Sequence, residues 1–186
     1  MEQVPLYLPE TARWYALISQ AEYETRCQLP VDAEHYLVRM LLRFTKEQEN
    51  RYVQEDRPEM SGGKRQKSYE KLNRLGDQCL LMTGLFPDHQ GKYPFPFSHF
   101  VETGENAYRE LARGRDRQGL FTFLGDNFVL LMDVLQQVRE LCDGYQFLDP
   151  IQAYDIWQET GSQRALSVLS GMTCSFPVGA MNTRPH

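Results

Sequence analysis

Apolar residues recur along this chain at spacings of three and four, the period of one buried face of an α-helix. These stripes predict helices that begin near Pro9, Val31, Ser68, Ser98, Gln118, Pro150 and Ser162. No segment shows the strict alternation of a half-buried strand bounded by hairpin turns. The pattern therefore predicts an all-α fold, a single-domain helical bundle of five to seven helices.

The segment from Gln118 to Cys142 is the most apolar of these predicted helices. A helix that is apolar over so much of its circumference fits the centre of a bundle, and it would equally fit a homodimer interface. Gly125–Asp126 is the place where this helix could break or bend, because glycine weakens a helix interior.

Proline and glycine mark several helix ends. Pro30 ends the first predicted helix, because proline lacks the amide hydrogen that a helix interior needs. Gly84 is expected to cap the third helix at its C-terminus, with Pro87 stopping any continuation. Asp149 and Pro150 form a strong start signal, an N-cap followed by proline in the first turn.

Two segments fall outside the regular pattern. Residues near 46–67 are strongly charged and contain Pro58 and a Gly-Gly pair, which predicts a mobile loop. Residues 172–186 show no periodicity and predict an irregular C-terminal tail. The helical domain is therefore expected to span residues 1–171.

Composition and charge narrow the choice of partners. The 186 residues suffice for one domain with a core, and the net charge of −5 argues against a protein that coats nucleic acid. A basic stretch at 64–74 is diluted by Glu70 and lacks an aromatic stacking platform, so nucleic acid is not the expected partner. No apolar run is long enough for a membrane span, and the first residues lack a basic leader. We therefore expect a cytoplasmic protein without membrane contact.

Motifs of the common enzyme classes are absent, including phosphate-binding loops and the zinc-protease and serine-hydrolase signatures. The four cysteines are too widely spaced to suggest a metal site. Two pairs, Asp32 with His35 and His99 with Glu102, place a carboxylate and an imidazole one helical turn apart. Acidic residues near helix starts also interact favourably with the helix dipole, which explains both pairs without a metal. The sequence thus predicts no metal and no other cofactor, and it leans against an enzyme.

Gly76 and Asp77 are the most unusual neighbours within a predicted helix. Glycine costs stability there unless another helix packs closely, and a buried carboxylate needs a partner. Gly104 allows close approach from the fourth predicted helix, and the Tyr108 hydroxyl can donate to Asp77. The favoured interpretation is a packed contact with an Asp77–Tyr108 hydrogen bond. The alternative is a ligand site formed by Asp77, Gly104, Tyr108 and His99.

The segment between the third and fourth helices, residues 86–100, combines three prolines with several aromatic residues. Prolines reduce the entropy lost on binding, and aromatic side chains are common anchors of protein interfaces. One interpretation is that this loop folds back onto the end of the bundle. The other is a partner-binding edge, with the following contact residues: Phe86, Tyr93, Phe95 and Phe97.

Residues 68–140 resemble a family of bacterial all-helical proteins that has no assigned activity. Its motifs are a Gly-Asp-x-x-Leu-x-x-x-Gly-x-Phe-Pro helix and a following Gly-x-x-Ala-Tyr helix. The matching positions here are Gly76, Asp77, Leu80, Gly84, Phe86 and Pro87, then Phe100, Gly104, Ala107 and Tyr108. The chain departs from the pattern at His99, where the family has an aromatic residue. The resemblance implies the same contact between Asp77, Gly104 and Tyr108, and it implies no function.

Two functional hypotheses follow. The first is a non-enzymatic regulatory or adaptor protein that binds another protein through its aromatic loop. The second is a helical bundle that binds a small molecule or a metal cofactor between the third and fourth helices, with enzymatic activity left open.

Overall fold

The computed structural model describes residues 9–50, 64–87, 95–114, 118–145 and 148–172, and every regular element within these ranges is a helix. The helices are α1 (Glu10–Thr25), α2 (Val31–Asn50), α3 (Lys64–Leu85), α4 (Phe97–Ala112), α5 (Gln118–Asp126), α6 (Phe128–Asp143), α7 (Pro150–Thr160) and α8 (Gln163–Met172). The all-α prediction is confirmed. The described residues contain eight helices instead of five to seven, because the fifth predicted helix divides into two.

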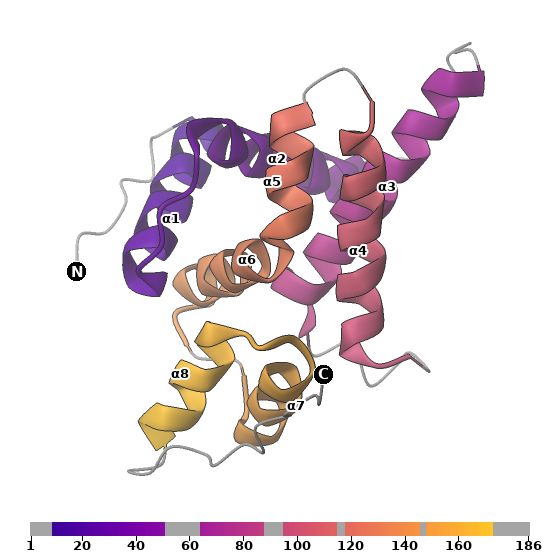
Figure 1. Cartoon of the computed structure of the whole chain (residues 1–186). Coiled ribbons are helices and arrows are strands. Elements are labelled where there is room, and N and C mark those ends of the chain that lie inside the picture. Colours follow the sequence, from indigo (N-terminus) through magenta and orange to yellow (C-terminus); the bar gives the residue numbers. More distant parts are fainter. Residues whose placement is uncertain (1–8, 51–63, 88–94, 115–117, 146–147, 173–186) are drawn as a thin grey trace, which may run out of the picture.

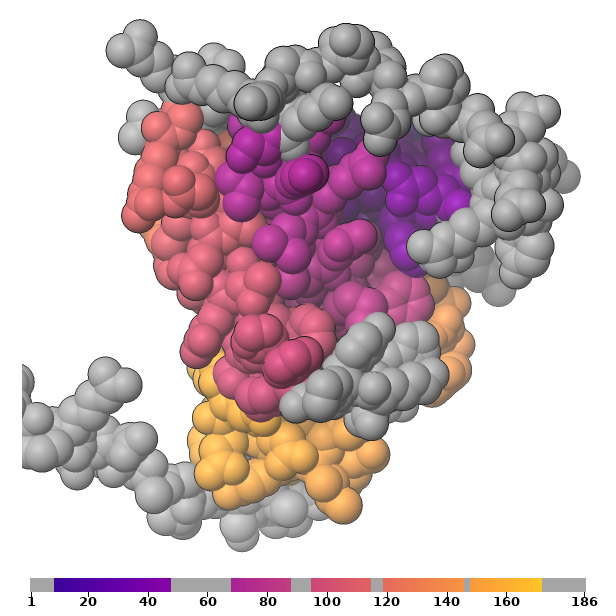
Figure 2. Space-filling model, turned by 90° about the vertical axis from the view of Figure 1, so that its right-hand side faces the viewer, coloured from indigo at the N-terminus to yellow at the C-terminus, as the bar shows by residue number. Residues whose placement is uncertain are grey.

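Helix α6 occupies the middle of the fold (Figure 1). It packs against α1 on one side and against α3 on another, while α7 and α8 form a pair below it. Helices α3 and α4 lie side by side along one face of the molecule, with α7 and α8 beneath them (Figure 2). The core is built around the apolar residues of α6, of which Leu131, Met132 and Leu135 are fully buried.

The break between α5 and α6 turns the chain by 76°. Asn127 leaves the helical conformation there, and its side-chain amide donates to the carbonyl oxygen of Phe123 at 3.0 Å. The preceding Gly125 lies against α4: a Cβ on it would come within 3.3 Å of the backbone nitrogen of Arg109. The predicted break is therefore confirmed, and it lies beside the point where Gly125 lets α5 approach α4 closely.

Helix ends follow the sequence signals in α7 but not in α3. The Asp149 carboxylate accepts from the amides of Ile151 and Gln152 at 2.8 and 2.9 Å, and Gly161 ends α7 at a φ of 73°. Gly84, by contrast, does not end α3, which continues to Leu85. A Cβ on Gly84 would lie 2.6 Å from Cβ of Leu135, so this glycine permits helix packing instead of capping.

The helices on either side of the charged segment extend further into it than predicted. Helix α2 continues to Asn50 and α3 already begins at Lys64, so both ends of the predicted loop at 46–67 are helical. Residues 51–63 and 173–186 lie outside the described residues. Among the described residues no single helix is long and apolar enough to cross a membrane, and α5 and α6 meet that test only as a bent pair.

Candidate functional site

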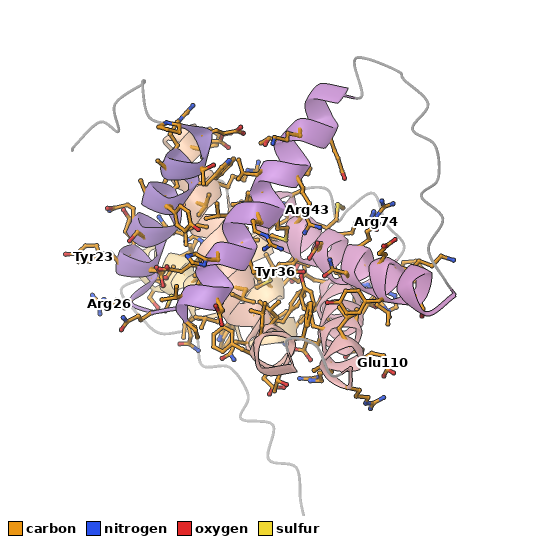
Figure 3. The ribbon with its side chains drawn as sticks, turned by 90° about the horizontal axis from the view of Figure 1, so that it is seen from above. Tyr23, Arg26, Tyr36, Arg43, Arg74 and Glu110 are labelled. Atoms are coloured by element: carbon orange, nitrogen blue, oxygen red, sulfur yellow. The ribbon has the colours of Figure 1, made fainter. Side chains whose placement is uncertain are left out.

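Asp77 lies buried in α3 and receives hydrogen bonds from two other helices. The Tyr108 hydroxyl of α4 donates to its Oδ1 at 2.9 Å, which confirms the predicted bond. The Tyr36 hydroxyl of α2 donates to the same oxygen at 2.5 Å, and Nη2 of Arg43 donates to Oδ2 at 2.8 Å. Figure 3 shows Tyr36 and Arg43 on the same side of α2, facing α3. We call these four residues the Asp77 cluster.

Asn73 completes the hydrogen bonding of Tyr36. The Tyr36 hydroxyl lies 2.7 Å from Oδ1 of Asn73 and 2.5 Å from Oδ1 of Asp77, both acceptors, yet it carries a single hydrogen. When that hydrogen points to the Asp77 carboxylate, the Asn73 amide can present its NH2 group to the phenol oxygen. Each oxygen of Asp77 then has a donor, and the aspartate is ion-paired with Arg43.

Burial controls the ionisation of this cluster. Loss of solvent raises the pKa of Asp77 above its ordinary value, although Tyr36, Arg43 and Tyr108 each favour the charged carboxylate and so lower it. Burial next to Asp77 also raises the pKa of both tyrosines. The two phenols therefore stay protonated and act as donors.

Aromatic rings fill the contact between α3 and α4. A Cβ on Gly76 would lie 2.6 Å from the ring of Tyr108, and a Cβ on Gly104 would lie 2.3 Å from the ring of Phe128. Tyr108 also stacks on Phe121, with ring centroids 6.2 Å apart. Both glycines therefore allow close packing, as predicted, and the geometry favours a packed contact over a ligand site at this place.

His99 does not join the Asp77 cluster. It is exposed in the first turn of α4, where its ring stacks on Phe95 with centroids 4.8 Å apart. Nine residues separate it from Tyr108, which corresponds to about 13.5 Å along the helix axis. Of the four residues in the predicted ligand site, the structure thus joins Asp77 and Tyr108 directly. Gly104 lies one turn before Tyr108, against Phe128 and Cys79, and His99 is remote from the cluster.

The predicted partner-binding residues have different environments. Phe95 is 52% exposed, whereas Phe97 is 3% exposed and belongs to the core. The assignment of Phe97 to an accessible loop is therefore corrected: α4 begins at Phe97 and turns this side chain inward. Phe86 is partly buried, with its ring 5.6 Å from that of Phe44, and Tyr93 lies outside the described residues.

A surface pocket opens between α2 and α5. It has a volume of about 400 Å³ and is lined by Asp32, His35, Tyr36, Arg39, Gly119 and Leu120. Within the described ranges no three His, Cys, Asp or Glu side chains gather closely enough to hold a metal ion. The spacing of Asp32 and His35 predicts that they share a helix face, but it does not predict the pocket, because the pocket depends on how α5 crosses α2.

A second buried carboxylate, Asp133 in α6, lies at the start of α8. Its Oδ1 accepts from the Ser162 hydroxyl at 2.6 Å, and its Oδ2 accepts from the backbone amide of Arg164 at 3.2 Å. Burial raises the pKa of Asp133 to about 6, although these donors favour the charged form. The contact attaches α8 to the centre of the fold. No local pattern predicts this contact, because Ser162 follows Asp133 by 29 positions along the chain.

No protein-family model, curated protein or solved structure matches this chain.

Proposed function

We propose that this protein is a non-enzymatic regulatory or adaptor protein that acts by binding another protein. The arrangement of its polar groups supports this function. Asp77 is fully engaged with Tyr36, Arg43 and Tyr108, and Asp133 is engaged with the start of α8. Neither carboxylate is left unpaired for general acid or base chemistry, and neither faces the α2–α5 pocket.

The observation that carries the proposal is a group of exposed apolar side chains on α7 and just before α4. Ile151 is 75% exposed and Tyr154 is 41% exposed, and their spacing of three places them on one face of α7. Phe95 is exposed on the segment that enters α4. The start of α4 meets the C-terminal part of α7, where the backbone amide of Ser98 donates to Glu159 at 2.7 Å, about 12 Å along the helix axis from Ile151.

Such side chains suit a protein partner. Large aromatic and aliphatic residues supply most of the binding energy at the centre of protein interfaces, and a polar rim surrounds them. Here the exposed residues next to the apolar ones on α7 include Asp155 and Glu159, and the chain as a whole is acidic. The expected partner therefore presents an apolar pocket with basic residues around it.

Site-specific photo-crosslinking tests this proposal. A photoreactive amino acid at position 151 should give a defined crosslinked product with another protein in cells, whereas the same group at Gln20, exposed on α1, should not. Replacing Tyr154 with Ser in the position-151 protein should reduce the product, because a hot-spot side chain is lost. A crosslink to a second copy of this chain would identify a homodimer as the bound state. Equal labelling from positions 151 and 20, or none from 151, would refute the proposed binding face.

A further inference from the structure

The pocket between α2 and α5 has the properties of a small-molecule site. Its volume of about 400 Å³ falls in the range of ligand pockets, roughly 300 to 1,000 Å³. It is separate from the apolar residues of α7, and it shares one residue, Tyr36, with the Asp77 cluster. Among the described residues, four with polar side chains and two without, Gly119 and Leu120, line it, so it can receive a ligand that has both a polar and an apolar part.

Three of the polar lining residues lie on one face of α2. Asp32, His35 and Arg39 occupy positions i, i+3 and i+7, which a helix places in line. His35 and Arg39 are one turn apart, so their nitrogen donors can approach one group together. Asp32 lies about 10.5 Å from Arg39 along the helix axis, at the opposite end of the row.

Arg39 is free to take a ligand. It forms no ion pair with any side chain in the described ranges, unlike Arg43 one turn further along α2, which is held by Asp77. A guanidinium group presents several N–H donors in a plane, an arrangement that matches a carboxylate or a phosphate. The Tyr15 ring of α1 packs edge-on against the His35 ring, with ring centroids 5.6 Å apart, and so helps to hold His35 in position.

The opposite wall is apolar and open. Leu120 of α5 lines it, while the ring of Tyr36 lines the α2 side beside His35 and is held in place because its hydroxyl is bonded to Asp77. A Cβ on Gly119 would meet no atom within 4 Å, so the absence of a side chain there leaves room at the wall. The pocket thus combines an anion-binding end, an apolar middle and a hydrogen-bond acceptor at the far end.

We propose that this pocket binds a small organic anion whose far end carries a hydrogen-bond donor. Arg39 and His35 hold the carboxylate or phosphate, Leu120 and Tyr36 contact the apolar body, and Asp32 accepts from the donor. This site is independent of the protein-binding face proposed above, so either proposal can fail without the other.

Three probes of similar size, which differ either in their charge or in the presence of a phenol, test the ligand class. They are 3-(4-hydroxyphenyl)propionate, which has a carboxylate and a phenol, 3-phenylpropionate, which lacks the phenol, and tyramine, which carries an amine in place of the carboxylate. Titration followed by amide NMR shifts should show the first binding with a Kd on the order of 1 mM, the second more weakly, and tyramine not at all. The shifted amides should include those of Arg39 and Leu120.

Variants locate the binding. Arg39→Gln should weaken 3-(4-hydroxyphenyl)propionate about tenfold, because one charge-assisted contact is lost. The control Arg74→Gln changes another exposed arginine, on α3, and should leave the Kd unchanged (Figure 3). Gly119→Leu should fill the pocket and abolish binding while the protein stays folded. Binding of none of the probes, equal binding of tyramine, or an unchanged Kd in Arg39→Gln would each overturn the proposal.

Discussion

Replacing Tyr108 with Phe tests whether the Asp77 cluster stabilises the fold through its hydrogen bonds. The ring stays in place against Gly76 and Phe121, and the loss is confined to the hydroxyl that donates to Asp77 at 2.9 Å. A hydrogen bond to a charged group contributes about 1.5 to 3 kcal/mol. We therefore expect the free energy of unfolding to fall by about 2 kcal/mol at a pH above the raised pKa of Asp77.

The loss should depend on pH. Burial raises the pKa of Asp77, so the folded protein holds this proton to a higher pH than the unfolded chain does. The stability that Asp77 contributes is therefore largest below its ordinary pKa and decreases as the pH rises through the raised value. The Tyr108 hydroxyl offsets part of this decrease, because it favours the charged carboxylate. Its removal should cost about 2 kcal/mol above the raised pKa and about 1 kcal/mol below it, where a neutral hydrogen bond is lost.

Urea unfolding followed by circular dichroism at several pH values measures this difference, and thermal unfolding should show a decrease in Tm of roughly 4 to 8 °C at a pH above the raised pKa. Tyr23→Phe is a matched control, because Tyr23 is 80% exposed and should change stability by less than about 0.5 kcal/mol. If Tyr108→Phe matched this control, or if its cost did not vary with pH, the hydroxyl would not stabilise the Asp77 carboxylate.

Two further predictions concern the core. Gly104→Ala should destabilise the protein by about 1 to 3 kcal/mol in urea unfolding, because the new Cβ would overlap the ring of Phe128, while Gly119→Ala should cause no loss. Equal effects would contradict the close packing of α4 against Phe128 of α6. Asp133, with its pKa raised to about 6, should contribute stability that is present below pH 4 and falls by roughly 2 to 3 kcal/mol as the pH rises toward 7. Asp133→Asn should flatten this part of the pH profile, and an unchanged slope would show that Asp133 is not its source.

The helices were predictable because each depends on local pattern. Apolar spacing locates α5 and α6, and Asp149 with Pro150 marks the start of α7. Gly84 was misassigned because a glycine near a helix end can serve either as a cap or as a point of close packing. The choice depends on Leu135, 51 positions further along the chain, whose side chain occupies the space beside it.

The site was predictable only in part, for the same reason. Gly76, Asp77 and Tyr108 stand out because glycine and a carboxylate are unusual inside a helix. Tyr36 did not stand out, since it fits the apolar stripe of α2, and nothing local shows that its hydroxyl reaches across to α3. Arg43 was equally hidden, because a charged residue on a helix surface is ordinary until its partner is known.

The main effect of the Asp77 cluster is to fix the relative positions of α2, α3 and α4, and its contribution to net stability is smaller. A buried ion pair often stabilises a protein no more than apolar residues of the same volume would. Its hydrogen bonds are directional, however, and they are satisfied only when α2, α3 and α4 have one relative register. That register fixes Tyr36, which also lines the α2–α5 pocket. The buried carboxylate therefore connects the packing of the core to the shape of the proposed ligand site, although no ligand would touch it.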